Sequence, residues 1–225
     1  MSFSKRMSRI KPSGIRAVQK RIAGKSDMIS FAAGLPDPAL YPLEDLRKAA
    51  DTMLEKEGAT AFAYGLTKGY GPLLDYLTDR MNNREHVECT KENIYILSGS
   101  QQGLGLAAMT FLDEGDVVIT ENPSYLGAIN AFRPYGAEFV GVDTDDDGIV
   151  IEDLERALEE NPKTKLIYVI PNFQNPTGKA WTLERRERFM EVVAKYDVAV
   201  VEDNPYGDLR FKGEPLPHLR ALDKK

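Results

Sequence analysis

Short apolar runs alternate with amphipathic segments through the second half of the chain. Each apolar run has the length of a buried strand, and the segments between them repeat their apolar residues with helical spacing. This alternation is typical of βα units that build a largely parallel sheet. We predict strands at residues 94–97, 116–120, 138–142, 166–170 and 198–201, and helices at residues 100–112, 125–132, 151–160 and 183–196.

The first part of the chain is predicted to hold helices joined by ordered loops. Residues 43–57 repeat apolar positions with helical spacing, and we expect Gly58 to stop that helix. Pro72 is suited to the first turn of another helix. Further expected elements are a short basic helix at residues 13–24 and loops rich in proline or glycine at residues 30–42 and 62–71.

The stretch from Lys165 to Gly178 is an apolar strand that breaks into a polar turn. Pro171 stops the run, and Asn175 follows at the carboxyl end of the predicted strand. In open α/β sheets ligands bind at that edge, so we expect Asn175 to enter a site. The alternative is an ordinary strand-to-helix turn, because Asn-Pro and Thr-Gly are common turn dipeptides.

The run Ser98-Gly99-Ser100-Gln101-Gln102-Gly103 lies between a predicted strand and a predicted helix. Free amides and the dipole of a helix start can bind a phosphate, and a glycine lets the backbone come close. The order of the glycines does not fit a dinucleotide-binding fold, and the Gly-Lys-Ser/Thr ending of a Walker A loop is missing. The alternative is a capping turn in which Ser100 is the N-cap.

Two other predicted strands also end in polar residues. Glu202 and Asp203 follow the last strand, and because neighbouring side chains of a strand point to opposite faces, we expect one of them to enter the cleft. A solvated or capping turn is the alternative for this carboxylate pair. The run Asn122-Pro123-Ser124-Tyr125 would bring an aromatic ring to the same edge, although a tyrosine that opens a helix is usually part of a core.

Charge and composition restrict the possible partners and compartment. The 29 Lys and Arg residues against 35 Asp and Glu residues give a net charge of −6, interspersed along the chain, which disfavours nucleic acid and anionic membrane as partners. The single cysteine, Cys89, fits a reducing compartment, and the basic start lacks the apolar core of a signal peptide, so we predict a cytoplasmic protein.

The acidic run Asp143 to Gly148 begins like a calcium loop. The glutamate required six residues after its glycine is replaced by Leu154. We therefore predict a solvated acidic turn and no metal site.

Five motifs together resemble the large domain of fold-type I, pyridoxal-phosphate-dependent aminotransferases of class I/II. The resemblance spans nearly the whole chain, and the wording of residues 31–36 and 171–178 is most similar to the 2-aminoadipate and multi-substrate branch. In chain order the motifs are Tyr64, Ser98-Gly99-Ser100-Gln101, Asn122-Pro123-Ser124-Tyr125, Asn175-Pro176-Thr177-Gly178 and Asp203-Asn204-Pro205-Tyr206.

The resemblance implies a fold and a division of the chain. The fold would be a three-layer αβα large domain with a mostly parallel sheet, incomplete here, with the small domain largely absent. Residues 1–42 would form an N-terminal helix and extended loop of the small domain or arm. Residues 43–225 would be the cofactor-binding large domain, ending before the Schiff-base lysine.

The resemblance also implies a role for each motif around bound pyridoxal phosphate. The cofactor phosphate would lie on Gly99, Ser100 and Gln101, and Tyr125 would stack on the pyridine ring. Asp203 would pair with the ring nitrogen. The remaining implied contacts are Asn175 and Tyr206 with the phenolic oxygen, Tyr64 with the phosphate of a neighbouring subunit's site in a homodimer, and Gly34, Arg16 and Asn175 with the substrate.

The activity implied is transfer of an amino group from an α-amino acid to a 2-oxo acid by a two-stage route. A non-catalytic, aminotransferase-like sensor domain of a transcriptional regulator is the alternative; residues 1–21 are too short for a winged helix, which favours the enzyme. The family's Schiff-base lysine, in a Ser-x-Ser-Lys segment, is expected beyond Lys225. We therefore expect a piece of a longer protein, which an intact-mass measurement would reveal, and little catalysis by this piece.

Overall fold

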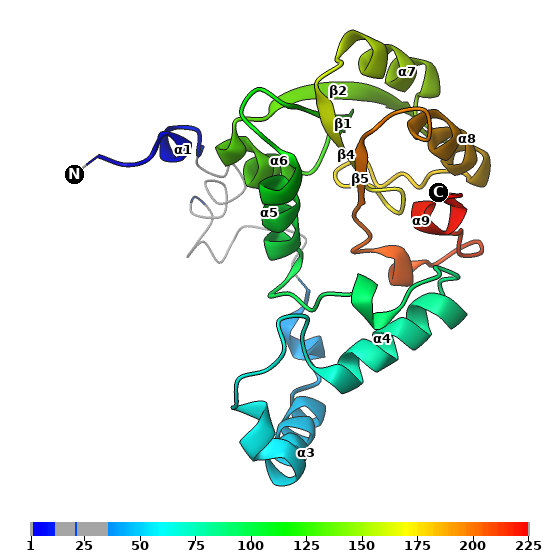
Figure 1. Cartoon of the computed structure of the whole chain (residues 1–225). Helices are drawn as coiled ribbons and strands as arrows, with labels where there is room; N and C mark the ends of the chain where they lie inside the picture. The colour runs from blue at the N-terminus through cyan, green and yellow to red at the C-terminus, as the bar shows by residue number, and fades with distance from the viewer. Residues whose placement is uncertain (1, 12–20, 22–35, 225) are drawn as a thin grey trace. The chain divides into compact units, whose positions relative to one another are not determined.

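The computed structural model describes residues 2–11, 21 and 36–224 (Figure 1). The chain divides into two compact units, one formed by Met1–Lys11 with Gly71–Lys225 and the other by Pro12–Tyr70. Apart from Arg21, the helix predicted at residues 13–24 lies outside the described residues, as do Arg16 and Gly34. The predicted division of the chain at residue 42 stays a prediction.

The larger unit is built on a five-stranded sheet in the order β3-β2-β1-β4-β5. Its parallel core pairs β1 with β2 and β4, and β4 with β5, whereas β3 is antiparallel to β2. The four strands of this parallel core are four of the five strands that the sequence predicts. The strands are β1 (Val117–Asn122), β2 (Glu138–Asp145), β3 (Gly148–Ile149), β4 (Thr164–Val169) and β5 (Ala199–Glu202).

The strand predicted at residues 94–97 is wrong for the part of the chain described. This segment leads into the next helix without strand structure, and its apolar residues Ile94, Ile96 and Leu97 are half-buried. An apolar run reports burial, whereas a strand also needs a neighbour to pair with, and no strand of the described residues pairs with this one.

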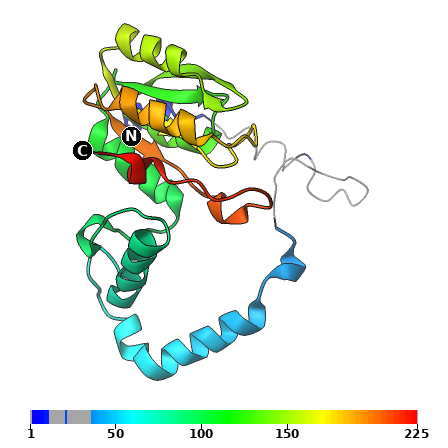
Figure 2. The same cartoon turned by 90° about the vertical axis from the view of Figure 1, so that its right-hand side faces the viewer.

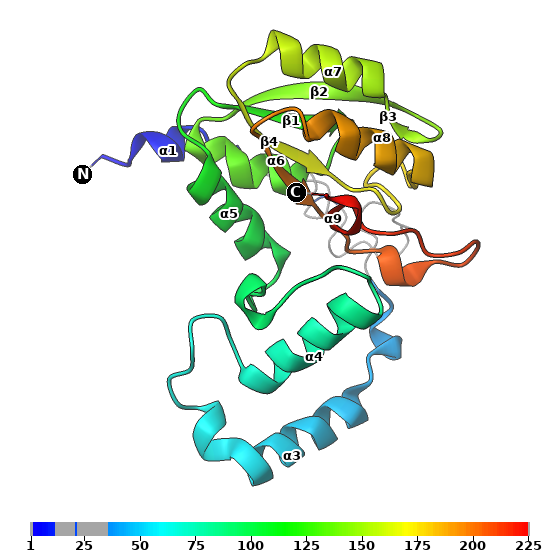
Figure 3. The ribbon, with the colours of Figure 1, turned by 45° about the vertical axis from the view of Figure 1, so that its right-hand side comes forward.

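Helices cover both faces of the sheet, which makes the three αβα layers that the family resemblance implies (Figure 3). Residues of β1 alternate between two cores: Val117 and Ile119 face α7 (Ile151–Glu160) and α8 (Leu183–Val193), while Val118 faces α5 (Ser100–Phe111) and α6 (Leu126–Phe132). The long apolar runs of β1 and β4 follow from this double cover, because both faces of these strands are buried.

The other helices of this unit are short apart from α4 (Gly71–Asn83), which begins beside Pro72 as predicted. Among the helices described, none has the length and apolar character that a bilayer crossing requires. The short elements are α1 (Lys5–Ser8), α9 (Leu219–Leu222) and the 3₁₀ turns η2 (Lys91–Asn93), η3 (Arg133–Tyr135) and η4 (Gly207–Leu209).

The smaller unit contains the turn η1 (Pro38–Leu40) and the long helix α3 (Leu43–Ala61), drawn in cyan in Figure 2. The helix was predicted to stop at Gly58 and instead continues to Ala61. Gly58 carries no positive φ, so it adds only the modest cost of a glycine inside a helix, and the residues that follow it extend the helix.

The acidic run predicted to be a solvated turn joins β2 to β3. Asp145 accepts a hydrogen bond from the Asp147 amide at 2.9 Å and pairs with Arg185 of α8 at 2.9 Å, so the turn is held both by its own backbone and by a neighbouring helix. In the part of the chain described here, no three His, Cys, Asp or Glu side chains gather into a group that could hold a metal ion.

Candidate functional site

The polar turns that follow β1, β4 and β5 meet at one edge of the sheet. These strands are neighbours and run parallel, so their carboxyl ends lie together. Residues 122–125 follow β1, residues 171–178 follow β4, and residues 203–206 follow β5. The arrangement matches the place where open α/β sheets bind ligands.

Helix α5 begins beside this edge with an N-terminus that no side chain caps. Gly99 is the N-cap residue, with a φ of 79° and no side-chain cap hydrogen bond. Ser100 is the first residue of the helix, so the alternative in which Ser100 is the N-cap is wrong. The positive φ favours glycine at position 99, and the first amides of a twelve-residue helix can bind an anion.

Tyr125 and α6 are tied to the start of α5. Gln101 donates to the carbonyl of Gly127 at 3.4 Å, and Tyr125 packs, half-buried, against the core beneath both helices. The Tyr125 ring lies so close to Gly127 that a Cβ at residue 127 would stand 2.3 Å from Tyr125 Cζ. Sequence reasoning missed Gly127, although a glycine at the second position of a short helix was a visible signal.

Asp203 and Glu202 point to different sides of β5, as the alternation of a strand predicts. Tyr168 Oη donates to Asp203 Oδ2 at 2.7 Å, and the Asp203 amide donates to the Val169 carbonyl at 2.9 Å. Glu202 instead lies 3.2 Å from His218 Nδ1. The hydrogen bond between His218 and Glu202 is the main cause of the raised pKa of His218.

Asn175 and Tyr206 are brought together from turns that lie far apart in the sequence. Asn175 Nδ2 donates to Tyr206 Oη at 3.4 Å. Beside them Asn172 Nδ2 donates to Asn204 Oδ1 at 2.9 Å, which links the same two turns a second time. The turn after β4 and the turn after β5 therefore form one surface.

A buried carboxylate, Glu121, fastens the turn that carries Asn175. Glu121 is 1% exposed and accepts hydrogen bonds from the Ile170 amide and from Trp181 Nε1, both at 2.9 Å. Burial raises the pKa of Glu121 to about 7, although these donors oppose the shift. Gln174 extends the clamp, since its Nε2 donates to the Pro123 carbonyl at 2.8 Å. A glutamate inside an apolar strand was the signal that sequence reasoning passed over.

A buried arginine holds the same turn from the side of α8. Arg186 is fully buried and donates to the Pro171 carbonyl at 3.1 Å, to Asn172 Oδ1 at 2.7 Å and to the Pro217 carbonyl at 2.9 Å. Burial lowers the pKa of Arg186 to about 10. The guanidinium thus joins the turn after β4 to the segment before α9.

Three predicted site residues are not part of this constellation as described. Tyr64 belongs to the smaller unit, where its side chain is exposed. Arg16 and Gly34 lie outside the described residues. The predictions for these three residues therefore stay predictions.

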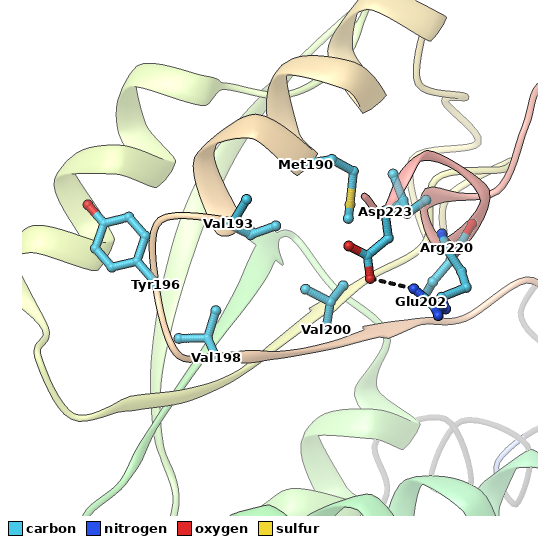
Figure 4. A pocket seen from close by; sticks show the side chains of 10 residues that line it. Met190, Val193, Tyr196, Val198, Val200, Glu202, Arg220 and Asp223 are labelled. Atoms are coloured by element: carbon cyan, nitrogen blue, oxygen red, sulfur yellow. Dashed lines mark hydrogen bonds and ion pairs between the residues drawn. The ribbon is translucent and has the colours of Figure 1, made fainter. Parts of the chain in front are cut away.

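The structure also has a groove on the side of β5 that carries Glu202 (Figure 4). Met190, Val193, Val198 and Val200 line much of it, and Arg220 pairs with Asp223 at 2.6 Å across its end. None of the predicted site residues lines it. Its lining is mostly apolar, and its charged groups pair within the protein, Arg220 with Asp223 and Glu202 with His218, so we do not take this groove as the candidate site.

Comparisons with known proteins agree with the geometry. The family described as "Aminotransferase class I and II" matches residues 26–224. The chain is 41% identical over 227 residues to Aromatic-amino-acid aminotransferase 1 of Thermococcus litoralis, an alignment that covers 99% of this chain and 54% of that protein. The chain therefore spans about half the length of the curated relatives it matches.

Two solved structures extend the comparison. Kynurenine aminotransferase of Pyrococcus horikoshii, solved in complex with PMP, has a TM-score of 0.91 and 38% identity, covering 99% of this chain and 56% of that one. Alpha-aminoadipate aminotransferase of Thermus thermophilus, complexed with N-(5'-phosphopyridoxyl)-L-leucine, has a TM-score of 0.85 and 38% identity, covering 98% and 53%. From the family match, the fold and the order of its motifs, the chain belongs to the class I and II aminotransferases.

Proposed function

We propose that this chain holds pyridoxal phosphate in a protein that transfers an amino group from an α-amino acid to a 2-oxo acid. The observation that carries the proposal is the convergence of the Asp203 carboxylate with the Asn175–Tyr206 pair at one sheet edge. The family match and the phosphopyridoxyl ligand of a solved relative support it.

The residues present fit a phosphorylated pyridine. The uncapped start of α5 offers amides for a dianion, and Gly99 has the backbone conformation that lets a ligand approach. Ser124 Oγ is buried and has no hydrogen-bond partner among the described residues, as expected of a group that waits for a ligand. The Asn175 amide contacts the Tyr206 phenol, and the Asp203 carboxylate follows β5 at the same sheet edge, so these groups suit the phenolic oxygen and the ring nitrogen of such a ring.

Each side chain then has a chemical task. Asp203 would hold a proton on the ring nitrogen, because a carboxylate beside a pyridinium stabilises its charged form. Asn175 and Tyr206 would donate hydrogen bonds to the phenolic oxygen and favour its anion, and Tyr125 would lie against the ring face. When bound, pyridoxal phosphate supplies an electron sink for a carbanion of the substrate.

The finer parts of the proposal concern the whole protein. We propose a homodimer in which Tyr64 reaches the phosphate of the neighbouring subunit's site, with Arg16, Gly34 and Asn175 beside the amino acid. The relatives named above act on different amino acids according to their names, so they leave the amino donor open.

Cofactor titration tests the proposal. Pyridoxal phosphate added to the purified chain should quench protein fluorescence saturably, and the Asp203→Ala variant should lose this binding. Asp197→Ala is the matched control, because Asp197 is exposed and precedes the first residue of β5, at the strand end away from Asp203. Binding that is unchanged in Asp203→Ala would place the ring elsewhere and overturn the proposal.

A further inference from the structure

Tyr168 is a polar side chain in the middle of the apolar run of β4. The residue is fully buried, and its ring meets Phe132 edge-on with centroids 5.9 Å apart. It belongs to the core that also contains Leu104 of α5 and Ala128 of α6. The helices that would carry the phosphate and the stacking ring therefore also fix the position of the Tyr168 ring.

The hydroxyl of Tyr168 reaches out of this core to the site. A buried phenol needs a hydrogen-bond partner, and Tyr168 finds it in Asp203 Oδ2 at 2.7 Å. The strand register explains the reach, because Tyr168 pairs with Val201 and Asp203 follows two residues later on the same face. The bond engages one oxygen of the carboxylate and leaves the other to a ligand.

The direction of this hydrogen bond is fixed. Burial, followed by the contact with Asp203, raises the pKa of the Tyr168 phenol, so the hydroxyl keeps its proton and donates. The phenol is thus a neutral donor behind the carboxylate proposed to face the ring.

We propose that Tyr168 is a positioning residue that acts through Asp203 on the protonation of the pyridine ring, an inference that rests on the proposed function. A donated hydrogen bond disperses the negative charge of the carboxylate and lowers its affinity for a proton. A proton shared between Asp203 and the ring nitrogen then stays on the nitrogen. The bond also sets the plane of the carboxylate toward the ring.

Tyr168→Phe removes the hydroxyl and keeps the buried ring. Two probes are titrated into wild type and variant: pyridoxamine phosphate, and its deaza analogue in which carbon replaces the ring nitrogen. We expect the variant to bind pyridoxamine phosphate at least about tenfold more weakly, the effect of losing a hydrogen bond to a charged group. Binding of the deaza analogue should be the same in both proteins.

The matched control is Tyr196→Phe, because Tyr196 packs against the core on the other face of the sheet. This variant should bind both probes as wild type does. Nitrogen NMR of ring-labelled pyridoxamine phosphate gives a second readout, since the resonance should move toward neutral pyridine in Tyr168→Phe. Fluorotyrosine at residue 168 keeps the shape of the side chain and donates more strongly, so it should move the resonance the other way.

The outcomes separate the two proposals. If wild type binds pyridoxamine phosphate, two results would overturn the role of Tyr168. One is that Tyr168→Phe weakens the binding of both probes equally or weakens neither. The other is that neither Tyr168→Phe nor fluorotyrosine moves the nitrogen resonance. Failure of wild type to bind pyridoxamine phosphate would overturn the proposed function, and this inference with it.

Discussion

Two carboxylates stand side by side at the end of β5 and have opposite surroundings. Asp203 lies on the face covered by α5 and α6 and accepts a hydrogen bond from the buried phenol of Tyr168. Glu202 lies on the face of α8 and α9, where it meets His218 and borders an apolar groove. Strand alternation gives the two neighbours different partners, and the Asp203 side is the one that we propose to hold a ligand.

The largest expected effect is a loss of cofactor affinity on one side of β5. Asp203→Asn should weaken the binding of pyridoxamine phosphate by about a thousandfold, because it would remove the carboxylate proposed to pair with the protonated, desolvated ring nitrogen. Glu202→Gln should leave the affinity within about threefold, since Glu202 is turned to the other face. Isothermal titration calorimetry measures the affinity of both variants for pyridoxamine phosphate. A comparable loss of affinity in Glu202→Gln would show that the two carboxylates do not differ in their effect on binding.

A second test concerns Arg186, which joins the turn after β4 to the segment before α9. Arg186→Met leaves the carbonyls of Pro171 and Pro217 and the Asn172 side chain without their donor, so it should lower the free energy of unfolding by about 3 kcal/mol. Urea denaturation measures this change.

Arg188→Met is the control for Arg186, because Arg188 lies on the same helix, α8, and forms an exposed pair with Glu152 of α7. It should change the free energy of unfolding by less than about 0.5 kcal/mol. Equal effects of the two substitutions would mean that the buried hydrogen bonds of Arg186 do not hold the turn.

A smaller effect is expected where Tyr125 lies over Gly127. Gly127→Ala would place a Cβ 2.3 Å from Tyr125 Cζ, so the ring must move away from its present position. We expect about fivefold weaker binding of pyridoxamine phosphate, the cost of partly losing an aromatic contact. Gly105→Ala in α5 is the control, because its Cβ would meet nothing within 4 Å. Retention of full affinity in Gly127→Ala would argue against stacking by Tyr125.

The smallest effect is expected for His218, the partner of Glu202, whose contribution to the free energy of unfolding depends on pH. The pKa of His218 is raised by its hydrogen bond to Glu202, so charged His218 stabilises the fold fully below its unfolded value of 6.5. That stabilisation is lost as the pH rises through the raised pKa of the folded state. The difference in unfolding free energy between wild type and His218→Gln should therefore be larger at about pH 5 than at about pH 9.

The control for His218 is His86→Asn, since His86 is the other histidine of the chain and is exposed. As a substitution of an exposed residue, it should change the free energy of unfolding by less than about 0.5 kcal/mol at either pH. Cofactor affinity should be independent of His218 at both pH values. A pH-dependent loss of affinity in His218→Gln would show that the two sides of β5 are coupled.

The sequence allowed β1 and β4 to be predicted because both of their faces are buried, which leaves unbroken apolar runs such as residues 166–170. It could not show that residues 94–97 lack a partner, since pairing is a property of segments far apart in the chain. Gly58 misled for a related reason: a glycine ends a helix only where the backbone turns to a positive φ.

Within the site, the residues on turns were found and those beneath them were not. Asp203, Asn175 and Tyr206 stand in turn motifs that the sequence displays. The supporting residues Tyr168, Glu121 and Arg186 acquire their partners through strand register and helix packing. Tyr168 in particular lies within the apolar run of residues 166–170, a pattern that predicts a buried strand and no site residue.

A crystal structure of the protein with pyridoxamine phosphate would show directly which groups hold the ring. We expect the ring nitrogen at hydrogen-bond distance from Asp203, with Tyr168 bonded to the same carboxylate and the phosphate on the amides of Ser100 and Gln101. A ligand bound in the groove beside Glu202, or a ring turned away from Asp203, would contradict this expectation.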